Sequence, residues 1–484
     1  MRILQRGVGA DFVEDRLQVE LAQTRLSPPD RHLCQELAYG IVRWQATLDW
    51  LIARKTKARA QKPLLQNLLR LGLYQIFWLD RIPAHAAVHE TVELAWQSGF
   101  HSQAGFINAV LRGYLREFDA TKRLLAELKT AQPHVGYSHP EWLVARWQKR
   151  WGADRAAQLM EWNNTPPKAF ARVNTLKADP GRLLAQWRDE DVEYDFVRRD
   201  WIDENLVFEL KSHPPLNRLP SFQQGLFYVQ DPGTLLAARE LAPQPGESVL
   251  DFCAAPGGKL TYLAQLMRNE GRLLAHDTTP ERLELIEQNC ARLGVTCVQT
   301  LLPSTLNSQP STLFDRILID APCSNTGVMR RRVDLRWRIR LEEIGRLQAT
   351  QRGLLRQAAL LLKPGGALVY STCSLEPEEN SQVVDEFLGE HAQFKLERTR
   401  ELLPFVEGVD GTYVARMVRN RSMRFRPSPI VSPIVNPVAA PGPLRIQQFQ
   451  PAMRPKREGI ETISNAKLYR QLLHKEWRGF GKAC

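Results

Sequence analysis

Between residues 216 and 419, short apolar segments alternate with longer segments of helical character. Four of the apolar segments are typical of buried strands: residues 248–252, 272–276, 316–320 and 367–371. This alternation predicts a mostly parallel α/β sheet covered by helices, in which ligands bind at the carboxyl ends of the strands. Functional residues of this region are therefore expected where those strands end.

The rest of the chain differs in character from this α/β region. Apolar residues recur at spacings of three and four, as in residues 64–77, which predicts an all-α domain over residues 1–132. Residues 133–215 mix one helix with short strand-like stretches and are interpreted as a small α+β connector. Residues 216–419 then form a Rossmann-like domain, and residues 420–484 a proline-rich basic tail. The fold class is therefore a multidomain protein.

The formal net charge of +12 resembles that of a nucleic-acid-binding protein, but it is unevenly distributed. Residues 421–484 hold 12 Lys and Arg against 3 Asp and Glu. A basic tail can simply keep a protein soluble, and proline recurs in this one from 427 to 455. We expect an extended linker there, with one helix over residues 465–477. RNA binding therefore needs support from the chemistry of the other domains.

The start of the chain and its cysteines bear on compartment and metal binding. An acid and glycines stand where a secretory signal needs an apolar core, which predicts a cytoplasmic protein without membrane contact. The seven cysteines show no Cys-x-x-Cys spacing, which argues against zinc and against disulfides. His85 and His89 are spaced to bind a metal, but no third ligand accompanies them, so helix packing is expected instead.

A glycine-containing turn follows the first of the four strands. Its seven residues are Cys253, Ala254, Ala255, Pro256, Gly257, Gly258 and Lys259. In a strand–turn–helix unit, backbone amides and a helix N-terminus can face a ligand. The segment is not a phosphate-binding Walker loop, because Leu260 replaces the Ser or Thr that would hold magnesium. Taken alone, the segment would more often be a simple tight turn.

Asp277 favours a ligand-binding turn over a simple tight turn. It ends the next strand, where an acid can accept hydrogen bonds from both ribose hydroxyls of a nucleoside. The turn and this acid together predict an adenosine-containing ligand without a long phosphate chain, such as S-adenosylmethionine. The predicted cofactor-binding set is therefore residues 253–259 with Asp277, and Asp320 at a further strand end.

Two cysteines lie at the ends of later strands, Cys323 in Asp-Ala-Pro-Cys-Ser and Cys373 in Ser-Thr-Cys-Ser. Such a pair suits chemistry on an electron-poor ring such as cytosine. Cytosine C5 is too weak a nucleophile to attack a sulfonium methyl directly, so a thiolate must first add at C6. Asp320 can hold a proton against N3 of the ring. This chemistry alone leaves open which of the two thiols attacks.

These motifs resemble those of the Sun/NOP2 family of RNA cytosine-C5 methyltransferases. The resemblance rests on residues 253–259, on 320–324 with Gly327 after it, and on 371–374 followed by 377–380. Upstream segments, residues 70–75, 82–90 and 106–112, look like the NusB-type helical RNA-binding domain that the small-subunit ribosomal RNA members carry. Roughly residues 1–419 are covered.

The resemblance implies roles for the candidate residues. Cys373 is then the nucleophile, and Cys323 assists removal of the C5 proton or release from the product. Lys259 belongs to the cofactor and active-site loop, together with Asp320, and Asp277 binds the ribose. The implied cofactor is S-adenosylmethionine. The implied partner is naked or early-assembly small-subunit ribosomal RNA, bound by a monomer without metal.

Two alternatives remain. One is a transfer-RNA methyltransferase, against which only the NusB-like segments weigh. The other is a non-catalytic RNA-binding protein of ribosome assembly on the same fold. It is motivated by a departure from the family pattern: residues 300–305 offer no acid for the adenine side of the cofactor. A second departure is Arg-Arg-Arg-Val-Asp at 330–334, where the family usually has Arg-Arg-His-Pro-Asp.

Overall fold

The computed structural model describes residues 2–5, 12–302 and 313–421. Contacts divide the chain into two units, residues 1–426 and 427–484, and all described residues belong to the first. The predicted tail lies almost wholly outside the described residues, as does its expected helix over 465–477.

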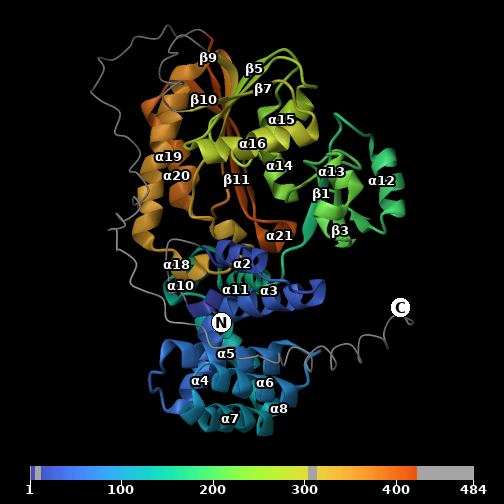
Figure 1. Cartoon of the computed structure of the whole chain (residues 1–484). Helices are drawn as coiled ribbons and strands as arrows, with labels where there is room; N and C mark the ends of the chain where they lie inside the picture. Colours follow the sequence, from blue (N-terminus) through green and yellow to red (C-terminus); the bar gives the residue numbers. More distant parts are fainter. Residues whose placement is uncertain (1, 6–11, 303–312, 422–484) are drawn as a thin grey trace, which may run out of the picture. The chain divides into compact units, whose positions relative to one another are not determined.

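The N-terminal region is helical, as predicted (Figure 1). The apolar residues at spacings of three and four face the core of this region. Leu68, Leu69 and Leu73, for example, are fully buried in one hydrophobic cluster. No helix within the described ranges is long and apolar enough to cross a membrane. The helices are α1 (Arg2–Gln5), α2 (Val13–Ala22), α3 (Pro28–Arg43), α4 (Gln45–Thr56), α5 (Pro63–Trp78), α6 (Ala84–Gln97), α7 (His101–Arg116), α8 (Phe118–Ala131) and α9 (Pro133–Gly136).

His85 and His89 lie on α6, and both side chains are exposed. The described residues contain no group of three or more His, Cys, Asp or Glu side chains arranged to hold a metal ion.

The connector contains four α-helices, one short 3-10 helix and a four-stranded antiparallel sheet of order β2-β3-β1-β4. Its fourth strand lies beyond residue 215, where the sequence was expected to enter the next domain, so connector and α/β domain share a core. The elements are α10 (Glu141–Trp151), α11 (Ala153–Asn164), β1 (Ala169–Val173), α12 (Pro180–Asp189), β2 (Glu193–Phe196), β3 (Val207–Ser212), η1 (Leu216–Arg218), α13 (Pro220–Gln223) and β4 (Phe227–Val229).

The larger sheet has seven strands in the order β10-β11-β9-β8-β5-β6-β7. Five neighbouring strands are parallel, and β11 runs antiparallel to both its neighbours, so the predicted mostly parallel sheet is confirmed. The strands are β5 (Ser248–Asp251), β6 (Arg272–His276), β7 (Val298–Leu301), β8 (Phe314–Asp320), β9 (Leu362–Thr372), β10 (Phe394–Leu402) and β11 (Thr412–Arg419).

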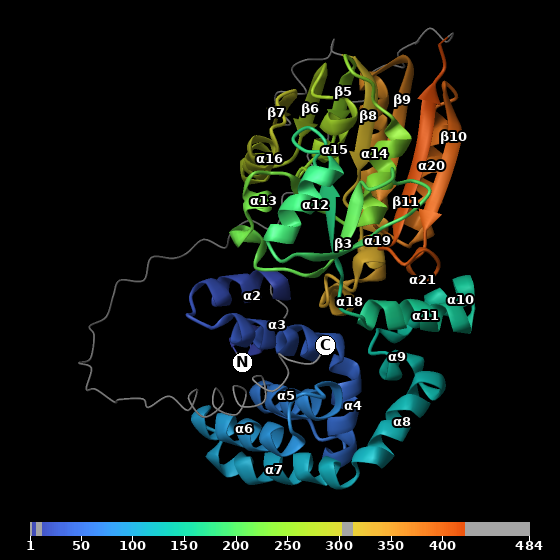
Figure 2. The ribbon, with the colours of Figure 1, turned by 90° about the vertical axis from the view of Figure 1, so that its right-hand side faces the viewer.

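Helices cover both faces of this sheet (Figures 1 and 2). Successive side chains of a strand point to opposite faces, so Val249 packs into one buried cluster and Leu250 into the other. Helices α14 (Leu235–Leu241), α15 (Gly258–Leu266) and α16 (Pro280–Leu293) contribute to the first cluster, and α19 (Leu341–Leu361) and α20 (Ser381–Glu390) to the second. The remaining short elements are η2 (Pro232–Thr234), η3 (Thr326–Val328), α18 (Leu335–Arg338), η4 (Pro377–Glu379) and α21 (Pro404–Glu407).

The segment around α18 joins the α/β domain to the helices. Arg336 is fully buried, and its guanidinium donates to the backbone oxygens of Ser138 and Asn163 at 3.2 and 2.9 Å. The Trp337 indole donates to the Val42 oxygen at 2.8 Å. The chain that leaves the Cys323 motif is therefore tied to the N-terminal region within about a dozen residues.

Candidate active site

The carboxyl ends of β5, β8 and β9 lie side by side. Asp320, the last residue of β8, is in register with Ser371 of β9, and Asp251 of β5 is in register with Leu318 of β8. The turns that follow β8 and β9 each carry one of the predicted cysteines. The parallel order of these strands thus brings together residues about 70 and 120 positions apart in the sequence.

The two thiols are in contact. The Sγ atoms of Cys323 and Cys373 are 3.3 Å apart, and the Cys373 thiol donates to Oδ1 of Asn325 at 2.9 Å. Cys323 is buried, whereas Cys373 is partly accessible. The hydrogen bond with Cys373 and burial raise the pKa of Cys323 well above its usual range. Cys323 therefore holds its proton at neutral pH, and Cys373 is the thiol better placed to reach a ligand.

Lys259 and Asp320 form an ion pair beside the thiols. Nζ of Lys259, from the first turn of α15, lies 2.6 Å from Oδ2 of Asp320, and the Ser371 hydroxyl donates to Oδ1 at 2.9 Å. Burial lowers the pKa of Lys259, but the negative charges of Asp320 and its neighbours outweigh burial and raise it above its ordinary value. The ammonium is therefore charged at neutral pH and fixes the orientation of the carboxylate.

Asp251 is a buried acid to which the sequence interpretation assigned no role. Asp251 is 1% exposed, and neither carboxylate oxygen has a hydrogen-bond partner of good geometry among the described residues, although the Cys253 amide is close enough to lower the pKa of Asp251. Burial and the nearby charge of Asp320 raise the pKa of Asp251 to about 8. A buried acid without donors can accept hydrogen bonds from a cationic ligand group, which would favour its charged form.

The turn over residues 253–259 connects β5 to α15, as predicted. Gly257 has φ +101°, a conformation that other residues rarely adopt, and a Cβ on Gly258 would lie 3.2 Å from the Tyr228 ring. The peptide bond between Ala255 and Pro256 is cis. Burial raises the pKa of the Cys253 thiol well above its usual range, so Cys253 is an inert thiol.

Asp277 follows β6 and points to the same turn. Its Oδ2 accepts from the Ala255 amide at 2.9 Å, and its Oδ1 accepts from the Thr278 amide at 2.7 Å. The Arg282 guanidinium also pairs with Oδ1 at 2.5 Å. Burial raises the pKa of Asp277, but these bonds lower it by more than burial raises it. The pKa is therefore below its usual value and the carboxylate is charged. A ribose at Asp277 would have to share the carboxylate with Arg282, a partner that the sequence did not reveal.

The structure brings the predicted catalytic and cofactor residues to one end of the sheet. Three further residues join them: Asp251, Asn325 and Glu379. Glu379 accepts hydrogen bonds from Ser324 and Ser374, the residues that follow the two cysteines. Glu379 stands within a recognised motif and Asp251 two residues before another, but only the folded chain shows the surroundings of their carboxylates.

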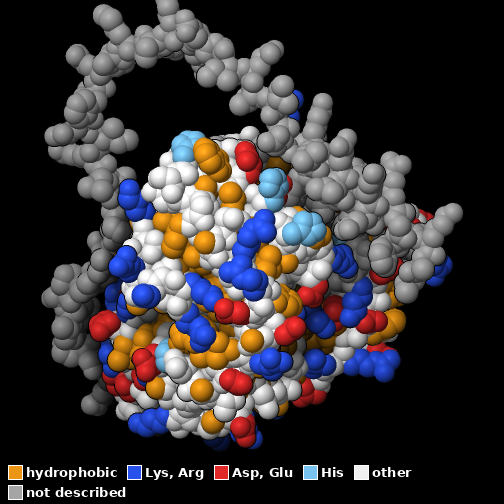
Figure 3. Space-filling view, turned by 90° about the horizontal axis from the view of Figure 1, so that it is seen from below, with side chains coloured by type: hydrophobic (Ala, Val, Ile, Leu, Met, Phe, Trp, Pro, Cys, Tyr) orange, Lys and Arg blue, Asp and Glu red, His pale blue; other side chains and the backbone are white. Residues whose placement is uncertain are grey.

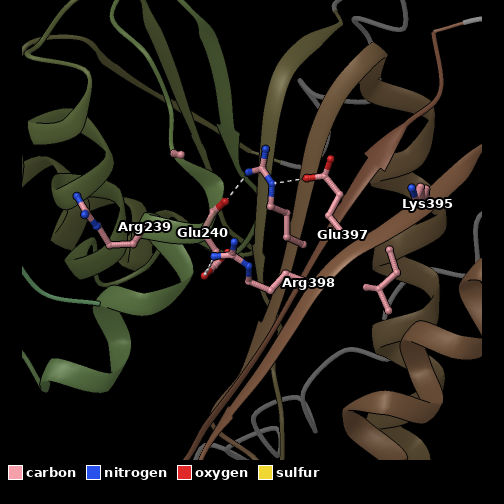
Figure 4. Close-up of a pocket in the computed structure, with 8 residues that line it drawn as sticks. Arg239, Glu240, Lys395, Glu397 and Arg398 are labelled. Atoms are coloured by element: carbon pink, nitrogen blue, oxygen red, sulfur yellow. Dashed lines mark hydrogen bonds and ion pairs between the residues drawn. The ribbon is translucent and has the colours of Figure 1, made fainter. Parts of the chain in front are cut away.

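A separate pocket lies between the end of α14 and strands β10 and β11 (Figure 4). It has a volume of about 520 Å³ and four cationic lining residues. Arg398 pairs with Glu240 at 3.3 Å, and Arg416 with Glu397 at 2.8 Å. Its charges are thus partly neutralised within the protein, and none of the predicted site residues lines it.

Comparisons with known proteins identify the family of the chain. The family described as 16S rRNA methyltransferase RsmB/F matches residues 238–418, and the NusB family matches residues 6–116. A ferredoxin-like domain of RsmF/B-like methyltransferases matches residues 139–209. The probable ribosomal RNA small subunit methyltransferase B of Bacillus subtilis is 36% identical over 429 residues, which cover 83% of this chain and 93% of that protein. The chain belongs to the RsmB/F family.

Other RsmB/F relatives show the same extent of similarity. The ribosomal RNA small subunit methyltransferase B of Klebsiella pneumoniae is 37% identical over 412 residues, covering 83% of this chain and 93% of that protein. The crystal structure of PH0851 has a TM-score of 0.68 at 26% identity, covering 84% of this chain and 94% of that one. The predicted family and the predicted fold class, with a NusB-like N-terminal domain, are therefore confirmed.

Proposed function

We propose that the protein transfers a methyl group from S-adenosyl-L-methionine to C5 of a cytosine in small-subunit ribosomal RNA. The thiol of Cys373 adds covalently to C6 of the ring. The observation that carries this proposal is the contact between two thiols at 3.3 Å, beside the Lys259–Asp320 ion pair. We further propose that the protein acts as a monomer in the cytoplasm, on RNA at an early stage of subunit assembly.

The residues around the first turn fit S-adenosylmethionine, which supplies an electrophilic methyl group on a positively charged sulfur. Gly257 and Gly258 allow close approach of the backbone, and the N-terminus of α15 suits the ligand's carboxylate. The unpartnered oxygens of Asp251 can accept hydrogen bonds from the ammonium group of S-adenosylmethionine. Asp277 can accept from its ribose hydroxyls when the Arg282 side chain moves off the carboxylate. The donor set thus contains a partner for each polar end of the molecule.

The thiols and the ion pair have different roles in the reaction of the cytosine ring. The Cys373 thiolate forms the bond to C6, which makes C5 nucleophilic. Asp320, oriented by Lys259, holds a proton at N3 and so stabilises the charge that develops on the ring. After the methyl group has been accepted, the C5 proton must leave and the bond from Cys373 to C6 must break.

Cys323 is placed to take the C5 proton. In the free protein its pKa is raised first by the hydrogen bond with Cys373, and the charge of Cys373 contributes as well. Once the Cys373 sulfur is bonded to carbon, it no longer carries that charge or proton. The pKa of Cys323 then falls, its thiol releases its own proton to solvent, and the resulting thiolate accepts the C5 proton.

The helical domain offers a surface for RNA. Figure 3, seen from below the helices, shows Lys and Arg side chains spread over this face among apolar ones and some acids. Helices α7 and α8 contribute the exposed residues Arg112, Lys122 and Arg123. A cytosine must leave its stack to reach Cys373, so contacts to the surrounding backbone are needed to hold the RNA.

Labelled S-adenosylmethionine and unmodified ribosomal RNA test the proposal with three proteins: wild type, Cys373→Ala and Cys323→Ala. We expect transfer from wild type only, and an RNA adduct that resists denaturant from Cys323→Ala only. The opposite adduct pattern would exchange the roles of the thiols. Transfer to transfer RNA but not to ribosomal RNA would change the substrate. No transfer, no adduct and no cofactor binding by wild type would favour the assembly-protein alternative.

A further inference from the structure

Glu379 lies directly behind the thiol pair and is completely buried. It ends the short helix η4, six residues after Cys373. Its Oε1 accepts from the Ser324 amide at 2.8 Å and from the Gln351 side chain at 3.1 Å. Its Oε2 accepts from the Ser374 hydroxyl at 2.5 Å and also from the Ser324 hydroxyl. Four donors from three segments thus converge on one carboxylate.

Two of those segments are the cysteine loops. Ser324 directly follows Cys323, and Ser374 directly follows Cys373. The two serine hydroxyls lie 3.1 Å apart, nearly the same separation as the two thiols. The carboxylate therefore bridges the loops one residue beyond the reacting cysteines. A change in the separation of the loops at this point would change the distance between the two sulfur atoms.

Hydrogen bonds to a buried charge are stronger than those between neutral groups, and the loss of such a carboxylate leaves its donors without partners. Other contacts between the loops do not involve Glu379: the Gly327 amide donates to the Cys373 oxygen at 2.9 Å, and the Ala321 amide to the Ser371 oxygen at 2.8 Å. These bonds, together with the bond from the Leu375 amide to the Thr326 hydroxyl at 2.8 Å, can hold the loops near one another when Glu379 is changed. Glu379 differs from them because it accepts from both serines that directly follow the cysteines.

We propose that Glu379 is a positioning residue that holds the Cys323 and Cys373 loops at one separation, so that both thiols act on the same ring. This inference rests on the proposed function for its catalytic consequence, but the separation itself is a property of the folded protein. A purely structural role would lower stability without changing the relation between the thiols.

Phenylarsine oxide measures that relation without substrate, because the arsenic exchanges its oxygen for two neighbouring thiols and releases water. We expect tight binding to wild type that is lost in Cys323→Ala. Glu379→Ala should weaken binding by about tenfold or more, and lower kcat for methyl transfer by roughly 100-fold with KM for S-adenosylmethionine unchanged, as expected for misplaced reacting groups. Glu379→Gln keeps two acceptor lone pairs and can donate to the serine hydroxyls, so it should recover most of both.

Glu378→Ala is the matched control, since that neighbouring acid pairs with Arg146 and not with the cysteine loops. It should behave as wild type in both assays. If Glu379→Ala does not fold, Ser324→Ala and Ser374→Ala each remove one of the bridging hydroxyls and should each weaken arsenical binding. Unchanged arsenical binding and unchanged kcat in the folded variants would overturn the proposal. A wild type that binds the arsenical but transfers no methyl group would instead contradict the proposed function.

Discussion

The two halves of the candidate site are built differently. On the thiol side, comprising residues 323–325, residues 373–374 and Glu379, polar groups are hydrogen-bonded to one another. On the cofactor side, comprising residues 251–259 and Asp277, the buried Asp251 has two oxygens without partners. The difference indicates that the fold itself holds the thiols in place. On the cofactor side, by contrast, the carboxylate of Asp251 gains hydrogen-bond partners only when a cationic ligand binds.

The largest expected effect is on the thiol side. Replacing Cys373 by Ala removes the atom that bonds to C6, so methyl transfer should fall by at least about 10⁴-fold. The thermal midpoint should change little, because the side chain is small and partly accessible. Single-turnover transfer of a labelled methyl group measures the loss, and Cys290→Ala, a buried cysteine on α16, is the control for loss of a thiol. Substantial activity in Cys373→Ala would mean that another group attacks the ring.

The second prediction concerns the ion pair between the two halves. Lys259→Met leaves the Asp320 carboxylate without its cation and without the group that orients it, so kcat should fall by roughly 10²-fold. Lys363→Met is the matched control, because Lys363 pairs with Asp315 at 2.8 Å near the opposite end of β8. Equal effects of the two substitutions on kcat would show that the Lys259 pair serves stability alone.

The third prediction is a pH dependence on the cofactor side. The folded protein keeps a proton on Asp251 up to about pH 8, whereas the unfolded chain loses it near pH 4. The raised pKa therefore contributes stability that is fully present below pH 4 and is lost as the pH rises towards 8. Asp251→Asn has no such loss and should be more stable than wild type by roughly 5 kcal/mol at pH 8, with little difference at pH 4.

Urea unfolding of the two proteins across this pH range measures that difference. Asp315→Asn provides a contrast, because Lys363 helps to keep the pKa of Asp315 below its usual value despite burial, and its contribution is lost as the pH falls. Asp251→Asn should also bind S-adenosylmethionine about tenfold more weakly, since it loses an acceptor for a cationic group. Parallel stability curves for Asp251→Asn and wild type would contradict the assignment of a protonated Asp251.

The smallest expected effect is at the pocket of Figure 4. Arg398 is exposed, and its pair with Glu240 at 3.3 Å is a surface ion pair. Arg398→Ala should leave kcat and KM within about twofold of wild type, because such pairs contribute little and the pocket contains no predicted site residue. A large loss of RNA methylation in this variant would place part of the functional surface at this pocket.

Much of the catalytic domain could be predicted from the sequence because its strands are short apolar runs with motifs at their ends. Strands β10 and β11 were not predicted: β10 is buried only at its two end residues, and its pairing with β11 depends on contacts within the fold. The bond from Asp277 to Arg282 and the bridge made by Glu379 were also missed. Both depend on where side chains meet in space, which motif spacing does not show.

The most direct test of the account is to locate the covalent bond. Cys323→Ala is incubated with ribosomal RNA and S-adenosylmethionine, the trapped complex is digested with protease and nuclease, and the modified peptide is identified by mass spectrometry. The account predicts a methylated cytidine on the peptide that contains Cys373. A nucleotide on a different cysteine, or full methyl transfer by Cys373→Ala without an adduct, would contradict it.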